Sequence, residues 1–123
     1  MPEGFVIDNL QGILDSIELI ETRFVGVANS DDFVMNANGV LMLDSICMRL
    51  QIIGELLKKI HKIDPVILES YTQIEWPNIM KLRDIISHHY DHVDHEIIYD
   101  ICQNKIPALK KTVQQMLKDH AAL

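Results

Sequence analysis

The sequence predicts an all-α fold, an antiparallel bundle of four or five helices. Apolar residues recur at spacings of three and four along most of the chain, which is the period of one helix face. No segment alternates apolar and polar residues as a half-buried strand does, and no glycine-rich loop, repeat or low-complexity stretch interrupts the pattern. A chain of 123 residues has the length of one domain, and we expect residues 1–123 to bury a single core.

The first two helices are expected to be long. Seven apolar positions predict the first helix, which should end near Gly26: Val6, Leu10, Ile13, Leu14, Ile17, Ile20 and Phe24. The polar stretch NSDDF offers serine and aspartate N-caps for a second helix. That helix continues through Val40, Leu43, Ile46, Leu50, Ile53, Leu57 and Ile60. It also carries further apolar stripes, at Leu41, Met48, Ile52 and Leu56. Because more than one of its sides then needs cover, the pattern indicates a homodimer.

Proline and aspartate mark the later elements. Pro65 ends the second helix, and Pro77 suits the first turn of a third helix. Asp94 stands where an N-cap belongs, with Glu96 in the first turn of the helix that follows. Pro107 is expected to break or kink that helix before its apolar period resumes.

The formal net charge of −7 argues against broad binding of nucleic acids, but the charge is unevenly distributed. Residues 1–56 hold two basic and nine acidic residues, whereas residues 57–123 hold nine of each, which gives −7 and 0 for the two parts. An anion site is therefore expected in the second part. Its candidates are Lys58, Lys59, Lys62, Lys81 and Arg83, although such lysines, taken singly, more often form a solvated helix face.

The cysteines and the apolar runs indicate a cytoplasmic protein. Cys47 and Cys102 lie far apart within apolar helical patterns and form no CxxC pair, so both are expected to be buried, reduced thiols. The first ten residues lack the basic segment of a signal peptide, and no apolar run approaches the ~18 residues of a membrane span. We therefore expect a soluble protein with no membrane association.

The stretch RDIISHHYDHVDHE contains four of the six histidines. His88, His92 and His95 are spaced four and three residues apart, as metal ligands on one helix face would be. Against a metal site, Asp94 is expected to start a new helix, and no cysteine is near to complete a closed ligand set. For His89, His92 and His95, a polar turn between helices that is rich in histidine is the simpler interpretation.

His88 also belongs to a motif. Arg83 precedes it by five residues and Tyr90 follows it by two, which gives R-x4-H-x-Y with Asp84 directly after the arginine. The spacing alone is a weak signal, but these residues lie at the polar end of an apolar-faced helix. With the segments NLQGILDSIELIE, LQIIGELLKKI, IEWPNIMKLRDIISHHY and VDHEIIYDICQNKIPALKKTVQQML, nearly the whole chain resembles the HepT-like proteins of the HEPN group of prokaryotic all-helical domains. The family pattern maps onto Arg83, Asp84, His88 and Tyr90, with His89 where many members have glycine.

The resemblance implies a HEPN-like homodimer that acts as a metal-independent endoribonuclease toxin and needs no cofactor. Arg83 and His88 would be catalytic, Asp84 would support them, and RNA would be the substrate. A small nucleotidyltransferase, usually encoded beside such a toxin, would neutralise it by transferring an adenylyl group from ATP to Tyr90. The residue types suit this chemistry, since a histidine can act as base or acid at neutral pH and an arginine can hold a phosphate through a bidentate contact.

Helix geometry limits how the motif can act. Five residues along an ideal helix turn through about 500°, so Arg83 and His88 would point about 140° apart on a continuous helix. Either the helix ends near His88 or the site is composed from two chains. Two chains would also supply two histidines, one as base and one as acid, and we favour this composite site.

Two functions from other classes stay open. One is a non-catalytic HEPN-type module that binds the nucleotidyltransferase, or a nucleotide, through the same motif. The other is a metal-binding helical bundle that uses His88, His92 and His95. A ribonuclease assay of the purified dimer with and without a chelator distinguishes the three functions.

Overall fold

A computed structural model describes the backbone of residues 2–121 and the side chains of residues 4–88 and 91–121. Within these ranges the chain is helical and has no strand, which confirms the all-α prediction. The elements are α1 (Pro2–Phe24), a 3-10 turn η1 (Ser30–Phe33), α2 (Ala37–Ile63), α3 (Pro65–Glu69), α4 (Trp76–His89), a 3-10 turn η2 (Tyr90–His92), α5 (His95–Asp100), a π-helical segment η3 (Ile101–Lys105) and α6 (Ile106–Ala121). In this described part of the chain, every helix is too short or too polar to cross a membrane.

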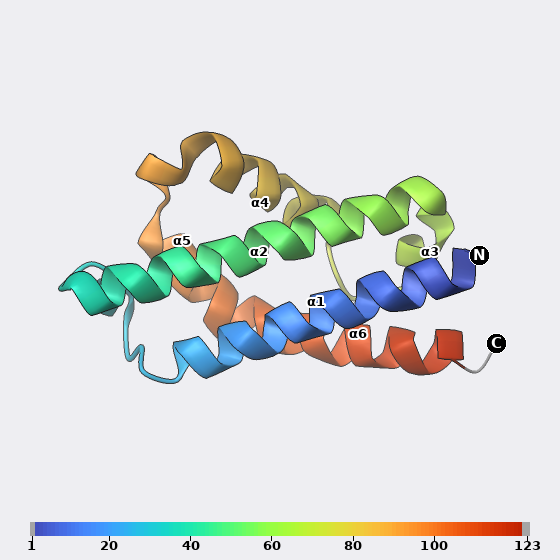
Figure 1. The fold of residues 1–123 in the computed structure, drawn as a ribbon, viewed down its shortest axis with the longest axis horizontal. Coiled ribbons are helices and arrows are strands. Elements are labelled where there is room, and N and C mark those ends of the chain that lie inside the picture. The colour runs from blue at the N-terminus through green and yellow to red at the C-terminus, as the bar shows by residue number, and fades with distance from the viewer. Residues whose placement is uncertain (1, 122–123) are drawn as a thin grey trace.

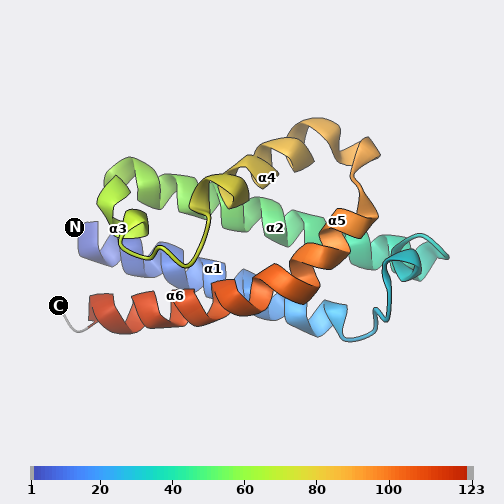
Figure 2. The same ribbon diagram turned by 180° about the vertical axis from the view of Figure 1, so that it is seen from behind.

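Antiparallel packing of the long helices produces the bundle (Figure 1). α1 runs antiparallel to α2, α6 lies along α1, and α4 packs on α2 in the opposite direction to it. α5, η3 and α6 follow one another as a bent, nearly continuous helical segment (Figure 2). A groove of about 420 Å³ separates α4 from η3 and α6, and Leu82 and Ile85 of α4 lie on one wall of it.

The core lies mainly between α1, α2 and α6, and most of the apolar positions predicted for the first two helices are buried in it. The largest fully buried side chains include Leu10, Ile13, Ile17, Ile20, Phe33, Ile46, Ile53, Leu57, Ile60 and Met116. Burial of each such side chain stabilises the fold by about 1.5–3 kcal/mol before entropy is counted. Cys47 and Cys102 are buried free thiols, as predicted, and burial raises the pKa of each to about 12.

The cap of α2 differs from the prediction. The stretch NSDDF does not cap α2 but forms η1, in which the Asn29 side chain accepts a hydrogen bond from the N–H of Asp32 at 3.2 Å. Asn36 caps α2 instead and accepts a hydrogen bond from the N–H of Gly39 at 2.8 Å. A Cβ at Gly39 would collide with the carbonyl oxygen of Asp32, so this glycine lets η1 pack against the first turn of α2.

The prolines end or begin helices largely as predicted. Pro65 is the first residue of α3, and Pro77 lies in the first turn of α4. Ahead of Pro107 the helix does not break. It widens into η3, where the N–H of Ile106 bonds to the carbonyl oxygen of Ile101, five residues back, and this wider turn is the expected kink.

Candidate functional site

α4 carries the motif, and its beginning is fixed to the rest of the bundle by two hydrogen bonds. Trp76 is buried, and its Nε1 donates to the carbonyl oxygen of Tyr71 at 2.9 Å. The Tyr71 hydroxyl donates in turn to Asp119 of α6 at 2.6 Å. Burial and this hydrogen bond raise the pKa of Tyr71 to about 12, so the hydroxyl keeps its proton at neutral pH. The start of α4 is therefore tied to the end of α6.

Arg83 lies at a close approach between α4 and α2. A Cβ built on Gly54 of α2 would lie 2.5 Å from the Cβ of Arg83 and 3.4 Å from the carbonyl oxygen of Ile79. Only glycine leaves room for this contact. Gly54 therefore sets how closely α4 approaches α2 at Arg83, and with it the position of the arginine side chain. Gly54 was not among the residues predicted from the sequence to belong to the site. An isolated glycine inside an apolar helical pattern was the available signal, because such a glycine often has a packing reason.

Asp84 joins Arg83 to α2. Its Oδ1 accepts a hydrogen bond from Nζ of Lys58 at 2.7 Å and another from Nη1 of Arg83 at 3.1 Å. The bond from Lys58, followed by that from Arg83, lowers the pKa of Asp84, and the carboxylate stays ionised at neutral pH. The side chains are 32–45% exposed, so the ion pairs add little stability, but they fix one edge of the guanidinium.

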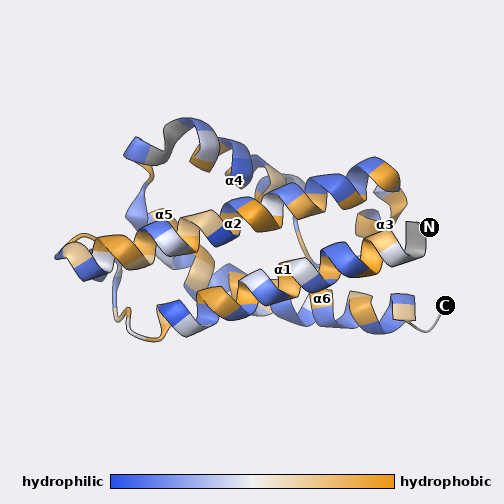
Figure 3. Ribbon diagram, in the orientation of Figure 1, coloured by the Kyte–Doolittle hydropathy of each residue, from blue (hydrophilic) through white to orange (hydrophobic). Residues whose placement is uncertain are grey.

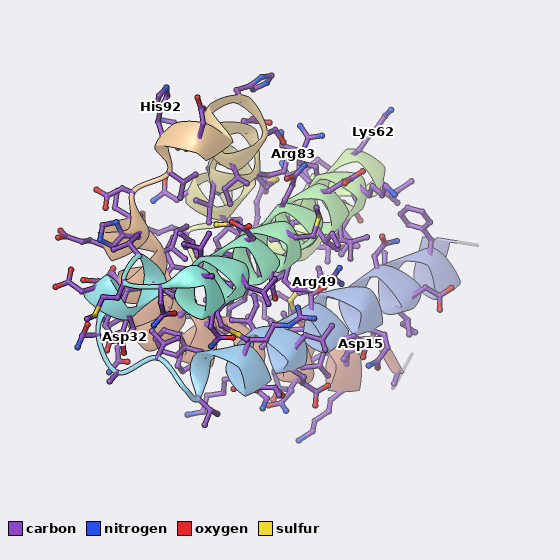
Figure 4. The ribbon with its side chains drawn as sticks, turned by 60° about the vertical axis from the view of Figure 1, so that its left-hand side comes forward. Asp15, Asp32, Arg49, Lys62, Arg83 and His92 are labelled. Carbon is purple, nitrogen blue, oxygen red and sulfur yellow. The ribbon has the colours of Figure 1, made fainter. Side chains whose placement is uncertain are left out.

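Part of the Arg83 guanidinium is available for an anion. The Arg83 side chain is 32% exposed, although its Nε is buried and forms no hydrogen bond with any described residue. A guanidinium has five N–H donors in a rigid fork, and the bond from Nη1 to Asp84 uses one of them. Figure 4 shows Arg83 on the same side of the α2–α4 pair as Lys62, near the end of α2. The arginine is therefore oriented by Asp84 and retains donors that suit phosphate oxygens.

The Lys58→Gln variant should show a raised pKa of Asp84, because the carboxylate loses the hydrogen bond that lowers its pKa most. A carboxylate with a lowered pKa stabilises the fold at pH values above its ordinary pKa, and this stabilisation is lost as the pH falls through the lowered pKa. The Lys58→Gln variant should therefore lose less stability on acidification than the parent does. NMR titration of the Asp84 carboxyl carbon measures the shift. Lys59→Gln, one position along α2, is the matched control, and an equal pKa of Asp84 in the two variants would contradict the contact.

α4 continues without a break through Arg83 and His88 and ends at His89. The angular offset of about 140° between residues five apart therefore applies, and the two side chains diverge within one chain. His88 is exposed on the last turn of α4, next to a hydrophilic turn (Figure 3). Tyr90 is the first residue of η2, but its side chain and that of His89 lie outside the described side chains.

The remaining histidines of the stretch lie on separate elements. His92 of η2 is exposed, with Nε2 at 3.2 Å from Oδ2 of Asp91, while His95 opens α5 with Nε2 at 3.9 Å from Oδ1 of Asp31. Asp94 caps α5 as predicted and separates the two. The common helix face that the metal interpretation requires is not formed. Among the side chains described, no three histidine, cysteine, aspartate or glutamate residues lie close enough together to hold a metal ion.

Residues 13–116 match the family model described as Ribonuclease HepT-like. The chain belongs to the HepT-like ribonuclease family. This confirms the resemblance drawn from the motif and the surrounding segments, and it confirms the predicted enzyme class, a ribonuclease, at the level of the family.

Relatives from archaea and bacteria match nearly the whole HepT-like chain. A candidate RNase of Methanocaldococcus jannaschii is 29% identical over 116 residues, which cover 94% of this chain and 87% of that protein. A candidate RNase of Caldanaerobacter subterraneus is 29% identical over 109 residues, or 89% and 91% of the two chains. A protein of Thermococcus cleftensis that is named as a ribonuclease HepT is 28% identical over 111 residues, or 90% and 94%. No solved structure matches significantly.

Proposed function

We propose that this HepT-like chain is a cytoplasmic, metal-independent endoribonuclease toxin that works as a homodimer. Arg83 and His88 form its catalytic site, and Asp84 orients the arginine. The observation that carries the proposal is the continuity of α4 through both catalytic residues. Because their side chains diverge within one chain, a second copy brings an arginine and a histidine together across a shared cleft.

The proposed chemistry needs a base, an acid and a cation. The base takes the proton from a 2′-hydroxyl of RNA, and the 2′-oxygen attacks the neighbouring phosphorus. The bond from phosphorus to the 5′-oxygen then breaks, and the acid protonates this leaving oxygen. The His88 side chains of the two protomers supply base and acid, and the Nη donors of Arg83 that are not bound to Asp84 stabilise the crowded phosphate.

The outward side of α2 supports the homodimer. Leu41 is 59% exposed and Met48 is 52% exposed, and Ile52 on the same side is partly exposed. Exposed apolar side chains that gather on one helix are typical of a surface that another chain covers. This surface belongs to the helix on which α4 packs, so contact through it would bring the two copies of the motif near each other.

Neutralisation by a nucleotidyltransferase is part of the same proposal, which makes the chain one half of a toxin–antitoxin pair. The partner enzyme transfers AMP from ATP to the hydroxyl oxygen of Tyr90, and pyrophosphate leaves. Tyr90 directly follows α4 and is two residues from His88. An attached AMP adds a negative charge and a bulky nucleoside beside the site, where its phosphate competes with RNA for Arg83.

One series of assays on the purified protein tests the proposal. RNA cleavage should persist in the presence of a chelator. Incubation with the partner nucleotidyltransferase and ATP should abolish cleavage and add one AMP or more per chain by intact mass. Tyr90→Phe should be neither modified nor silenced. Loss of cleavage on chelation, restored by zinc, would favour the metal-binding bundle, and partner binding without any cleavage would favour the non-catalytic module.

A further inference from the structure

The last turns of α2, beyond its contact with Arg83 of α4, carry three lysines. We call Lys58, Lys59 and Lys62 the α2 lysine cluster. Lys58 contacts α4 directly through its 2.7 Å hydrogen bond to Asp84. Lys62 lies one helical turn further along α2, and Figure 4 shows it on the same side of the α2–α4 pair as Arg83. Lys59 is exposed between them. The cluster is therefore continuous with the phosphate-binding arginine.

The charge of the cluster is opposite to that of the whole chain. The cluster and Arg83 carry four positive charges against the two negative charges of Asp84 and Glu55, which leaves +2 in a chain of net charge −7. Lys59 and Lys62 form no ion pair with any described residue, whereas Lys58 pairs with Asp84. Lys81, another lysine that the sequence offered for an anion site, lines the groove between α4 and α6 and is not part of this surface.

We propose that the α2 lysine cluster is a phosphate track that holds the RNA strand on one side of the cleaved bond. The proposal rests on the proposed function, in which Arg83 binds the scissile phosphate. α4 runs antiparallel to α2, so His88 and Lys62 lie on opposite sides of Arg83 along the bundle (Figure 1). From Gly54, beneath Arg83, to Lys62 is eight residues, or about 12 Å along the helix, which is longer than a single phosphate group.

RNA suits this surface better than an acidic protein does. A strand whose phosphate is held at Arg83 must continue in both directions, and one of these directions passes over the cluster. Lysine ammonium groups on flexible stems contact successive phosphates without reading the bases, and such contacts fix the register of a strand. The cluster therefore adds affinity and position to the site and leaves base preference unchanged.

Binding of RNA to a variant that does not cleave it tests the track. In a His88→Ala background, the Lys59→Gln/Lys62→Gln variant and its parent are titrated with a labelled short single-stranded RNA, and fluorescence anisotropy gives the affinity. Each lost phosphate contact should lower the slope of log affinity against log salt by about 0.7. Loss of both contacts lowers the slope by about 1.4. When salt rises from about 50 to about 200 mM, the fold loss of affinity in the cluster variant should therefore be about one seventh of the fold loss in the parent.

Lys111→Gln/Lys118→Gln is the matched control, because both lysines are exposed on α6 and the net charge changes equally, from −7 to −9. The control should keep the parent's slope. The track is refuted if the cluster variant also keeps that slope, if the control loses as much, or if light scattering shows that only the cluster variant loses its dimer. Cleavage is not needed for binding, so an unmutated chain, with His88 in place, that binds RNA through the cluster yet never cleaves it would refute the proposed function alone.

Discussion

His88→Ala should lower the rate of RNA cleavage by a factor of about 10² to 10⁴, the range that general acid–base catalysis contributes. The melting temperature should stay at the parent's value, because His88 is exposed on the last turn of α4 and its removal leaves no cavity. Single-turnover cleavage of a labelled RNA, together with thermal unfolding followed by circular dichroism, measures both effects.

The controls are the neighbouring histidines that the proposal leaves out of the chemistry. His92 is 78% exposed in η2, and His95 faces Asp31 at the start of α5. Replacement of either residue by alanine should change cleavage only mildly. A His88→Ala variant that cleaves as fast as the parent, or a His95→Ala variant that is equally inactive, would show that the catalytic histidine is assigned wrongly.

Gly54→Ala should destabilise the fold and inactivate the enzyme together. The new Cβ would lie 2.5 Å from the Cβ of Arg83, and neither atom can turn away, so α4 must shift on α2. Overpacking of this kind costs about 1–3 kcal/mol. The higher helix propensity of alanine offsets at most about 1 kcal/mol of this cost. The shift also moves Arg83 relative to Lys58, so chemical denaturation and cleavage should both report a loss.

Gly12→Ala is the matched control for Gly54→Ala. Gly12 lies in α1, and a Cβ there would meet only the tip of the Leu56 side chain, at 3.0 Å. A flexible side-chain end can move by a few tenths of an ångström, so stability and cleavage should stay close to the parent's values. If the two glycine variants behaved alike, the close approach of α4 to α2 at Gly54 would not position the site.

Local signals predicted most of the fold. The apolar period located α1, α2 and α4, and Asp94 was correctly expected to cap α5, because a cap depends on the few residues around it. The cap of α2 could not be chosen in the same way. Two polar stretches precede that helix, and the packing of Gly39 against Asp32, a tertiary contact, places Asn36 rather than NSDDF at its start.

In the candidate site, too, the local features could be predicted from the sequence and the contacts between helices could not. The motif gave Arg83, Asp84 and His88, which share one helix, and the periodicity of that helix gave their angular offset. The contact of Lys58 with Asp84 spans 26 residues, and it depends on which face of α2 meets α4, as does the role of Gly54. Apolar stripes on several sides of α2 leave that face undetermined in the sequence. The homodimer and the modification of Tyr90 stay predictions.

The groove beside α4 has a consequence for the motions of the molecule. Within the described residues, α2 is the only long helix against which α4 packs to a large extent, and the groove lies between the other side of α4 and α6. A helix held on one side can open while α1, α2 and α6 stay folded, so amide hydrogens of α4 should exchange with solvent at a lower free energy than those of the core. We therefore expect Arg83 and His88 to reposition together with α4, without unfolding of the bundle.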